Sequence, residues 1–159
     1  MHARFPQEVA SAQARAGWFP GRRLRPRTEQ WIGALHGHVS PDGHRHSVFP
    51  AAVEAWAEFG ELTVDLDGAG RFLARTPFTI NPMAGLHRPR TLADLGRALG
   101  LGLAPLGEEH ISQALLAIDA MGRVHSLDSS GDWFLGETVD QALTTLIAGT
   151  APARLALHA

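Results

Sequence analysis

Apolar residues recur at every third or fourth position in five stretches of the chain, which is the spacing of one buried helix face. The predicted helices span residues 6–16, 28–35, 50–59, 91–99 and 138–148. Thr28 and Thr91 are the predicted N-caps of the second and fourth helices, and Asp94 completes a capping box with Thr91. Trp56 lies on the apolar face of the third helix, so it is a predicted core residue. Glycines follow four of these helices and act as stop signals, namely Gly17, Gly60, Gly100 and Gly149.

Alternating or short apolar runs bounded by turn residues predict β-strands between the helices. The predicted strands are residues 62–66 and 71–75 around a turn at 67–70, then 78–80, then 113–119 and 123–128 around a turn at 120–122, and 132–136. Tight turns of this kind require antiparallel pairing. The sequence therefore predicts an α+β fold, with a mainly antiparallel sheet and helices packed against it. We expect a single domain over residues 1–149, followed by a loose C-terminal tail, 150–159.

The composition excludes several kinds of site. The 159 residues include no cysteine, so thiolate metal sites, disulfides and cysteine nucleophiles are absent. No apolar run is long enough to span a membrane. We therefore expect a cytoplasmic protein without membrane contact.

Charge is distributed unevenly along the chain. Residues 1–30 carry six arginines against two acids, whereas residues 101–149 carry seven acids against Arg123 alone. Within the acidic third, Asp119, Asp128 and Asp132 stand at predicted strand ends. They are candidates for a divalent-cation site, but aspartate is also common in turns because its side chain accepts local backbone hydrogen bonds. We favour the turn role.

Catalytic motifs are missing from the sequence. It contains no phosphate-binding glycine loop, no nucleophile elbow and no H-E-x-x-H metal motif. The segment "EEHIS", residues 108–112, offers Glu and His side chains, yet sequence neighbours on a loop seldom converge on one reacting group. The basic segment "RRLRPR", residues 22–27, has enough arginine to contact phosphate, but no recognised nucleic-acid-binding motif follows it. We interpret both as solvated or structural segments.

One stretch, "HGHVSPDGHRH", has the composition of a metal site. His36, His38, His44 and His46 flank a predicted turn at residues 41–43 and would suffice as zinc ligands. A small metal-dependent hydrolase or nuclease using these histidines with Asp42 is therefore the alternative to a binding protein. We expect a polar loop without bound metal, whose charge changes near pH 6.5.

Five segments, in order, resemble the third subgroup of the SUKH family. They are "AGWFPGRR" (16–23), "FPAAVEAWAEFGELTV" (49–64), "APLG" (104–107), "LAIDAMGRVHSLD" (116–128) and "FLGETVDQALTTLIAG" (134–149). The chain departs from the family pattern at Glu61, where a glycine is usual, and at His125, where an aromatic residue is usual. Residues 36–47 resemble an extension between the second and third helices.

The resemblance implies a bacterial immunity protein, which binds and neutralises a cognate toxin, commonly one that modifies nucleic acid. Such a protein needs no cofactor and no catalytic residue, and we expect a monomer or weak homodimer that does not itself bind nucleic acid. A regulatory scaffold is a further alternative, because related folds occur outside toxin systems. The acidic third would complement a basic toxin site. The candidate contact residues are Glu61, Asp119, Asp128, Asp132 and Trp133.

Overall fold

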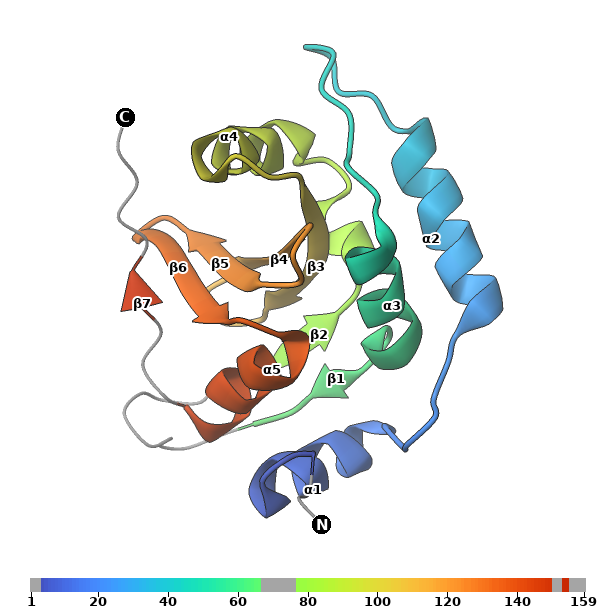
Figure 1. The fold of residues 1–159 in the computed structure, drawn as a ribbon, viewed down its shortest axis with the longest axis vertical. Helices are drawn as coiled ribbons and strands as arrows, with labels where there is room; N and C mark the ends of the chain where they lie inside the picture. Colours follow the sequence, from blue (N-terminus) through green and yellow to red (C-terminus); the bar gives the residue numbers. More distant parts are fainter. Residues whose placement is uncertain (1–3, 67–76, 150–152, 155–159) are drawn as a thin grey trace.

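The computed structural model describes residues 4–66, 77–149 and 153–154, which form one antiparallel sheet with helices on both faces (Figure 1). The strands follow one another across the sheet in chain order, and each pairs antiparallel with the next. They are β1 (Thr63–Val64), β2 (Phe78–Ile80), β3 (Leu103–Glu109), β4 (Leu115–Asp119), β5 (Val124–Asp128), β6 (Gly131–Gly136) and β7 (Ala153–Arg154). The predicted α+β class is confirmed.

Helices cover the two faces unequally. The helices are α1 (Gln7–Ala16), α2 (Arg25–Gly37), α3 (Pro50–Phe59), α4 (Pro89–Leu99) and α5 (Val139–Ala148), with a short 3-10 helix, η1 (Pro82–Gly85). Residues of α1, α3 and α5 form the larger core with one face of the sheet, and α4 forms a smaller core with the other face. Helix α2 packs on α3 and forms an outer layer beside it (Figure 1).

Strand β4 lies between these two cores. Leu116 and Ile118 face the larger core, whereas Leu115 and Ala117 face α4, because successive strand residues point to opposite faces. This burial on both sides explains why "LLAI" is a continuous apolar run without polar alternation.

Trp56 joins α3 to the sheet, as its position on the apolar face predicts. Its side chain is completely buried, and the indole Nε1 donates a 2.9 Å hydrogen bond to the carbonyl of Pro105 in β3. The register between β3 and β4 shifts between Pro105 and Gly107, so the regular ladder is interrupted here. Trp56 therefore provides a hydrogen-bond donor for the carbonyl of Pro105, next to the shift in strand register.

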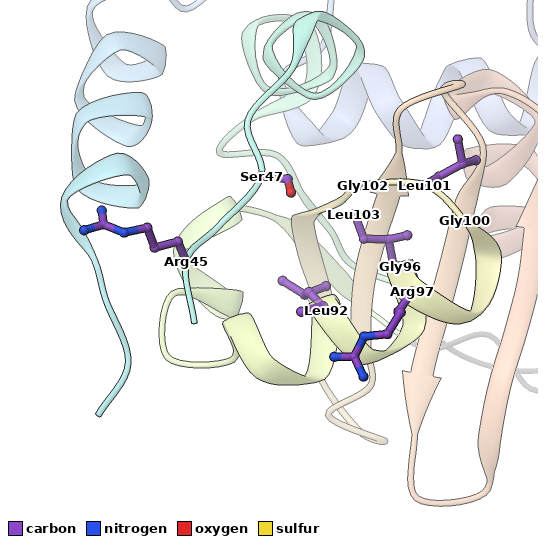
Figure 2. A pocket seen from close by; sticks show the side chains of 10 residues that line it. Arg45, Ser47, Leu92, Gly96, Arg97, Gly100, Leu101, Gly102 and Leu103 are labelled. Carbon is purple, nitrogen blue, oxygen red and sulfur yellow. The ribbon is translucent and has the colours of Figure 1, made fainter. Parts of the chain in front are cut away.

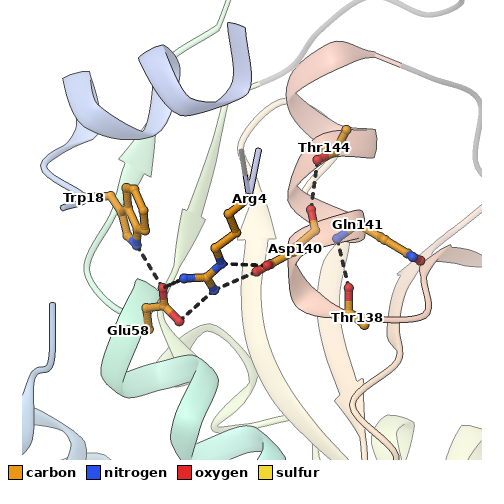
Figure 3. A network of polar contacts seen from close by, with 7 residues as sticks. All are labelled: Arg4, Trp18, Glu58, Thr138, Asp140, Gln141 and Thr144. Atoms are coloured by element: carbon orange, nitrogen blue, oxygen red, sulfur yellow. Dashed lines mark hydrogen bonds and ion pairs between the residues drawn. The ribbon is translucent and has the colours of Figure 1, made fainter. Parts of the chain in front are cut away.

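A cluster of polar contacts around Arg4 ties α1, α3 and α5 together (Figure 3). The guanidinium forms ion pairs of 2.7 Å with both Glu58 and Asp140, and Trp18 donates a hydrogen bond to the same Glu58 carboxylate. The Arg4 guanidinium also lies 5.0 Å from the ring centroid of Phe5. Hydrogen bonds to the carboxylates of Asp140 and Glu58 raise the pKa of Arg4, so its guanidinium is charged at neutral pH.

Several predicted boundaries are wrong. Helix α2 begins at Arg25 with proline in its first turn, and Thr28 is buried inside the helix, where its hydroxyl donates to the carbonyl of Leu24 instead of capping. Helix α4 begins at Pro89, so Thr91 and Asp94 form no capping box, and Asp94 pairs with Arg97 instead.

Two strands were not predicted. Strand β3 contains a proline and a glycine, which are depleted in strands and conceal it. Part of the predicted tail, Ala153–Arg154, pairs with β6 as β7. The predicted turn at 67–70 and strand at 71–75 lie outside the described residues.

Candidate acidic binding surface

The antiparallel order of the sheet brings two acidic turns to the same end. The register across β3, β4, β5 and β6 aligns Glu108, Leu115, Leu127 and Asp132. Three inter-strand spacings place the Cα atoms of Glu108 and Asp132 about 14 Å apart, on the same face of the sheet. Asp128 begins the β5–β6 turn at this end. We call Glu108, Asp128 and Asp132 the acidic end.

The carboxylates of the described residues differ in whether they have a cationic partner. Within the described residues, no arginine or histidine forms an ion pair with any member of the acidic end. By contrast, ion pairs with arginine hold Asp42, Glu54, Glu58, Glu61, Asp94, Asp119 and Asp140. Among the residues that the structure describes, Glu108, Asp128 and Asp132 therefore form a group of acidic side chains without an ion-pair partner.

Asp128 is fixed in its turn by local hydrogen bonds. Its carboxylate accepts from the backbone N–H of Ser130 at 2.7 Å and from the Ser130 hydroxyl at 2.5 Å. Partial burial would raise the pKa of Asp128, but these bonds and one from the Trp133 side chain outweigh it and lower the pKa. Asp128 is thus charged at neutral pH, and the half-buried Trp133 lies beside it.

Asp119 occupies the opposite end of the sheet and is completely buried. It accepts hydrogen bonds from the backbone of Met121 and Arg123, from the Arg123 guanidinium at 2.9 Å and from His125 at 3.0 Å. Burial alone would raise the pKa of Asp119, but the bonds from His125 and Arg123 outweigh it and lower the pKa. Asp119 therefore organises the β4–β5 turn and has no exposed surface for a partner.

Glu61 is exposed, but an arginine compensates its charge. Its carboxylate pairs with Arg27 of α2 at 2.6 Å. The backbone of Glu61 has a φ of 67°, in the left-handed region that glycine adopts most readily. A glycine would adopt this backbone conformation more readily than Glu61 does. The ion pair with Arg27 links the Glu61 side chain to α2.

The basic segment has structural partners as well. Arg22 donates hydrogen bonds of 2.7 and 2.8 Å to the carbonyls of Glu58 and Gly60, at the C-terminal end of α3, where cations are favourable. Arg23 pairs with Glu54 on the same helix at 2.7 Å. These contacts agree with a helix-end role for the segment.

The histidine stretch forms the end of α2 followed by a short hairpin. An isolated bridge joins Val39 to Arg45, so His38 and His46 are cross-strand neighbours with ring centroids 5.6 Å apart. The ring centroid of His87, in the turn before α4, lies 5.1 Å from the ring centroid of His38. His36, on the last turn of α2, forms no ring contact with this group, and His44 lies 3.6 Å from Asp42. The structure therefore brings His38 and His46 together with His87, but His36 and His44 form no ring contact with that group.

His46 anchors the hairpin through a fixed tautomer. Its Nε2 lies 2.7 Å from the carbonyl of Leu86, which only accepts, so Nε2 carries the proton and the buried Nδ1 is left without a partner. Burial lowers the pKa of His46, and the nearby His38 and His87 lower it further, against the opposing effect of the Leu86 carbonyl. Across the described part of the chain, no three His, Asp or Glu side chains are grouped to hold a metal ion.

A groove of about 480 Å³ lies between α4 and the segment at residues 45–47 (Figure 2). Leu92 and Leu103 supply apolar walls, while Arg45 and Arg97 lie at its rim. The lining contains one hydroxyl, from Ser47, and no carboxylate or imidazole that would act as its base. The groove therefore offers no acid–base pair for catalysis.

Sequence reasoning missed Ile111, the most exposed large apolar side chain of the described residues. It lies in the β3–β4 turn, next to the acidic end, with 74% of its surface exposed. In the sequence, the only indication of this residue is an isoleucine between the polar residues His110 and Ser112. Because strand β3 was not predicted, the turn that carries Ile111 was not predicted either.

Comparison with known proteins identifies the family. The family model described as SUKH-3 immunity protein matches residues 5–149. No curated protein and no solved structure matches the chain. None of the helices in the described ranges is long and apolar enough to cross a membrane. Because the family model spans strands β1 to β6 and all five α-helices, this chain belongs to the SUKH-3 immunity protein family.

Proposed function

We propose that this chain is a stoichiometric inhibitor that neutralises a cognate toxin acting on nucleic acid, by covering the toxin's basic substrate site. Membership of an immunity protein family supplies the toxin as partner. The acidic end supports the proposal that the toxin acts on nucleic acid and is inhibited at its basic site. Its members, Glu108, Asp128 and Asp132, have no cationic partner among the described residues. An enzyme that binds nucleic acid needs a positively charged site, and these carboxylates complement it.

The proposed contact surface includes Trp133 and excludes two residues that the sequence suggested. Asp119 is buried, and the charge of Glu61 is paired with that of Arg27. Trp133 is half-buried and its side chain donates a hydrogen bond to Asp128, so it lies at the edge of the acidic end. Tryptophan is enriched among residues that dominate interface energy.

Inhibition by occlusion requires tight binding but no chemistry, so the proposed protein is not an enzyme and uses no cofactor. It acts in the cytoplasm of the cell that carries it, as a monomer or weak homodimer, without contacting membrane or nucleic acid itself.

The proposal is tested by reversing charge at the acidic end. Replacing Asp128 and Asp132 by Lys should slow association with the purified toxin encoded by the neighbouring gene, because charges at the rim of an interface act chiefly on the association rate. The difference in association rate between the variant and wild type should shrink in high salt. The screening length is roughly 8 Å at physiological ionic strength and becomes shorter as salt is added.

A matched control separates local from global charge. Glu8→Lys with Glu29→Lys changes the net charge equally, on the exposed sides of α1 and α2. This control should associate at nearly the wild-type rate in low salt. Equal slowing by both double variants would contradict a docking role for the acidic end, and equal rates for all three proteins would assign it to solubility alone.

A further inference from the structure

The β3–β4 turn displays a large apolar side chain on a firmly held backbone. On one side of Ile111, the backbone N–H of His110 donates to the carbonyl of Pro77 at 2.9 Å. The imidazole Nε2 of His110 lies 2.6 Å from the Thr79 hydroxyl of β2. Two contacts to the neighbouring strand therefore fix the residue that precedes Ile111.

The other side of the turn is also closed by hydrogen bonds. The N–H of Glu109 donates to the carbonyl of Ala114 at 3.0 Å, and the Ser112 hydroxyl donates to the Glu109 carboxylate at 2.9 Å. Gln113 completes the turn with a φ of 57°. A partner that binds Ile111 would thus meet a turn that is already ordered, so little loop entropy is lost on binding.

The surroundings of Ile111 define the chemistry of the partner. Glu108 is the second-last residue of β3, and Asp128 and Asp132 lie at the same end of the sheet, so the turn that carries Ile111 lies beside a negatively charged rim. The other three exposed large apolar residues lie elsewhere, and Met121 is at the opposite end of the sheet, beside Arg123. Only the Ile111 site combines apolar exposure with uncompensated negative charge among the described residues.

We propose that Ile111 is the apolar anchor of the toxin contact and inserts into an apolar depression on the toxin that is rimmed by basic side chains. This inference rests on the proposed function and names the central residue of its contact surface. The acidic end accelerates the encounter, whereas burial of Ile111 slows dissociation, because interface energies are dominated by a few desolvated anchors surrounded by weaker contacts.

The test compares Ile111→Ala with Met121→Ala, a control in which a side chain of similar size and 71% exposure is removed from the opposite sheet end. Binding of each variant to the purified neighbouring-gene toxin is followed by surface plasmon resonance. Ile111→Ala should weaken binding at least tenfold, mainly through faster dissociation, with an unchanged melting temperature. Met121→Ala should stay within twofold of wild type.

Three outcomes would overturn the anchor. If both variants bind within twofold of wild type, the toxin is bound elsewhere and the proposed function stands without the anchor. If Met121→Ala alone weakens binding, the contact lies at the other end of the sheet. If the wild-type chain does not bind the toxin, the proposed function fails and the anchor fails with it.

Discussion

Replacing Trp56 should reveal how far the fold depends on one buried side chain and its hydrogen bond. Trp56→Phe keeps most of the apolar volume but leaves the carbonyl of Pro105 without its donor. An unsatisfied buried carbonyl costs about 1–3 kcal/mol. Trp56→Ala also opens a cavity, which brings the loss to roughly 3–5 kcal/mol or more. Since small domains are stable by only about 5–15 kcal/mol, the alanine variant should be close to unfolding at physiological temperature.

Urea denaturation followed by circular dichroism measures these losses, with Trp18→Phe as the control. Trp18 also donates a hydrogen bond, of 3.1 Å, but its acceptor is the carboxylate of Glu58, which water reaches. Its loss should therefore cost less than about 1 kcal/mol. If Trp56→Phe were as stable as Trp18→Phe yet bound the toxin more weakly, Trp56 would belong to the interface and its assignment to the core would be wrong.

Three further predictions concern charge, protons and metal. Arg4→Ala should lower the free energy of unfolding by about 1–2 kcal/mol in dilute buffer and by less in 1 M salt, because its ion pairs are partly exposed; an equal loss in both solutions would exclude an electrostatic origin. The lowered pKa of His46 means that the unfolded chain binds its proton more readily, so this contribution to stability is present above about pH 6.5 and is lost as pH falls below it. His46→Gln should then flatten the change in melting temperature between pH 7 and pH 5, and a profile identical to wild type would contradict this role. The purified protein should contain no stoichiometric metal and keep its melting temperature in chelator; one zinc per chain, lost in His44→Ala, would refute that expectation.

Local signals were sufficient where the chain itself determines the structure. Gly17, Gly100 and Gly149 end their helices in the left-handed conformation, with φ values of 112°, 73° and 69°, and sequence alone identified all three. Thr138 caps α5 as the first residue of the predicted helix, accepting from the N–H of Gln141. Each of these features depends on residues within one turn of each other.

Features that depend on distant partners were not predictable in the same way. The carbonyl of Pro105 in strand β3 accepts its hydrogen bond from Trp56, which is far away in the chain. The aspartates of the acidic third looked alike in sequence, yet Asp119 is buried by His125 and Arg123, and Asp128 stays at the surface. Only the pairing of the strands separates them to opposite ends of the sheet.

Inhibition of the toxin by a defined amount of this chain tests the central claim most directly. The purified toxin domain encoded by the neighbouring gene is assayed on DNA and RNA while increasing amounts of the chain are added. A stoichiometric inhibitor predicts that activity falls linearly and reaches zero at one molar equivalent of wild-type chain. Toxin activity that persists at a tenfold molar excess, or that disappears at a small fraction of an equivalent, would contradict neutralisation by one-to-one occlusion.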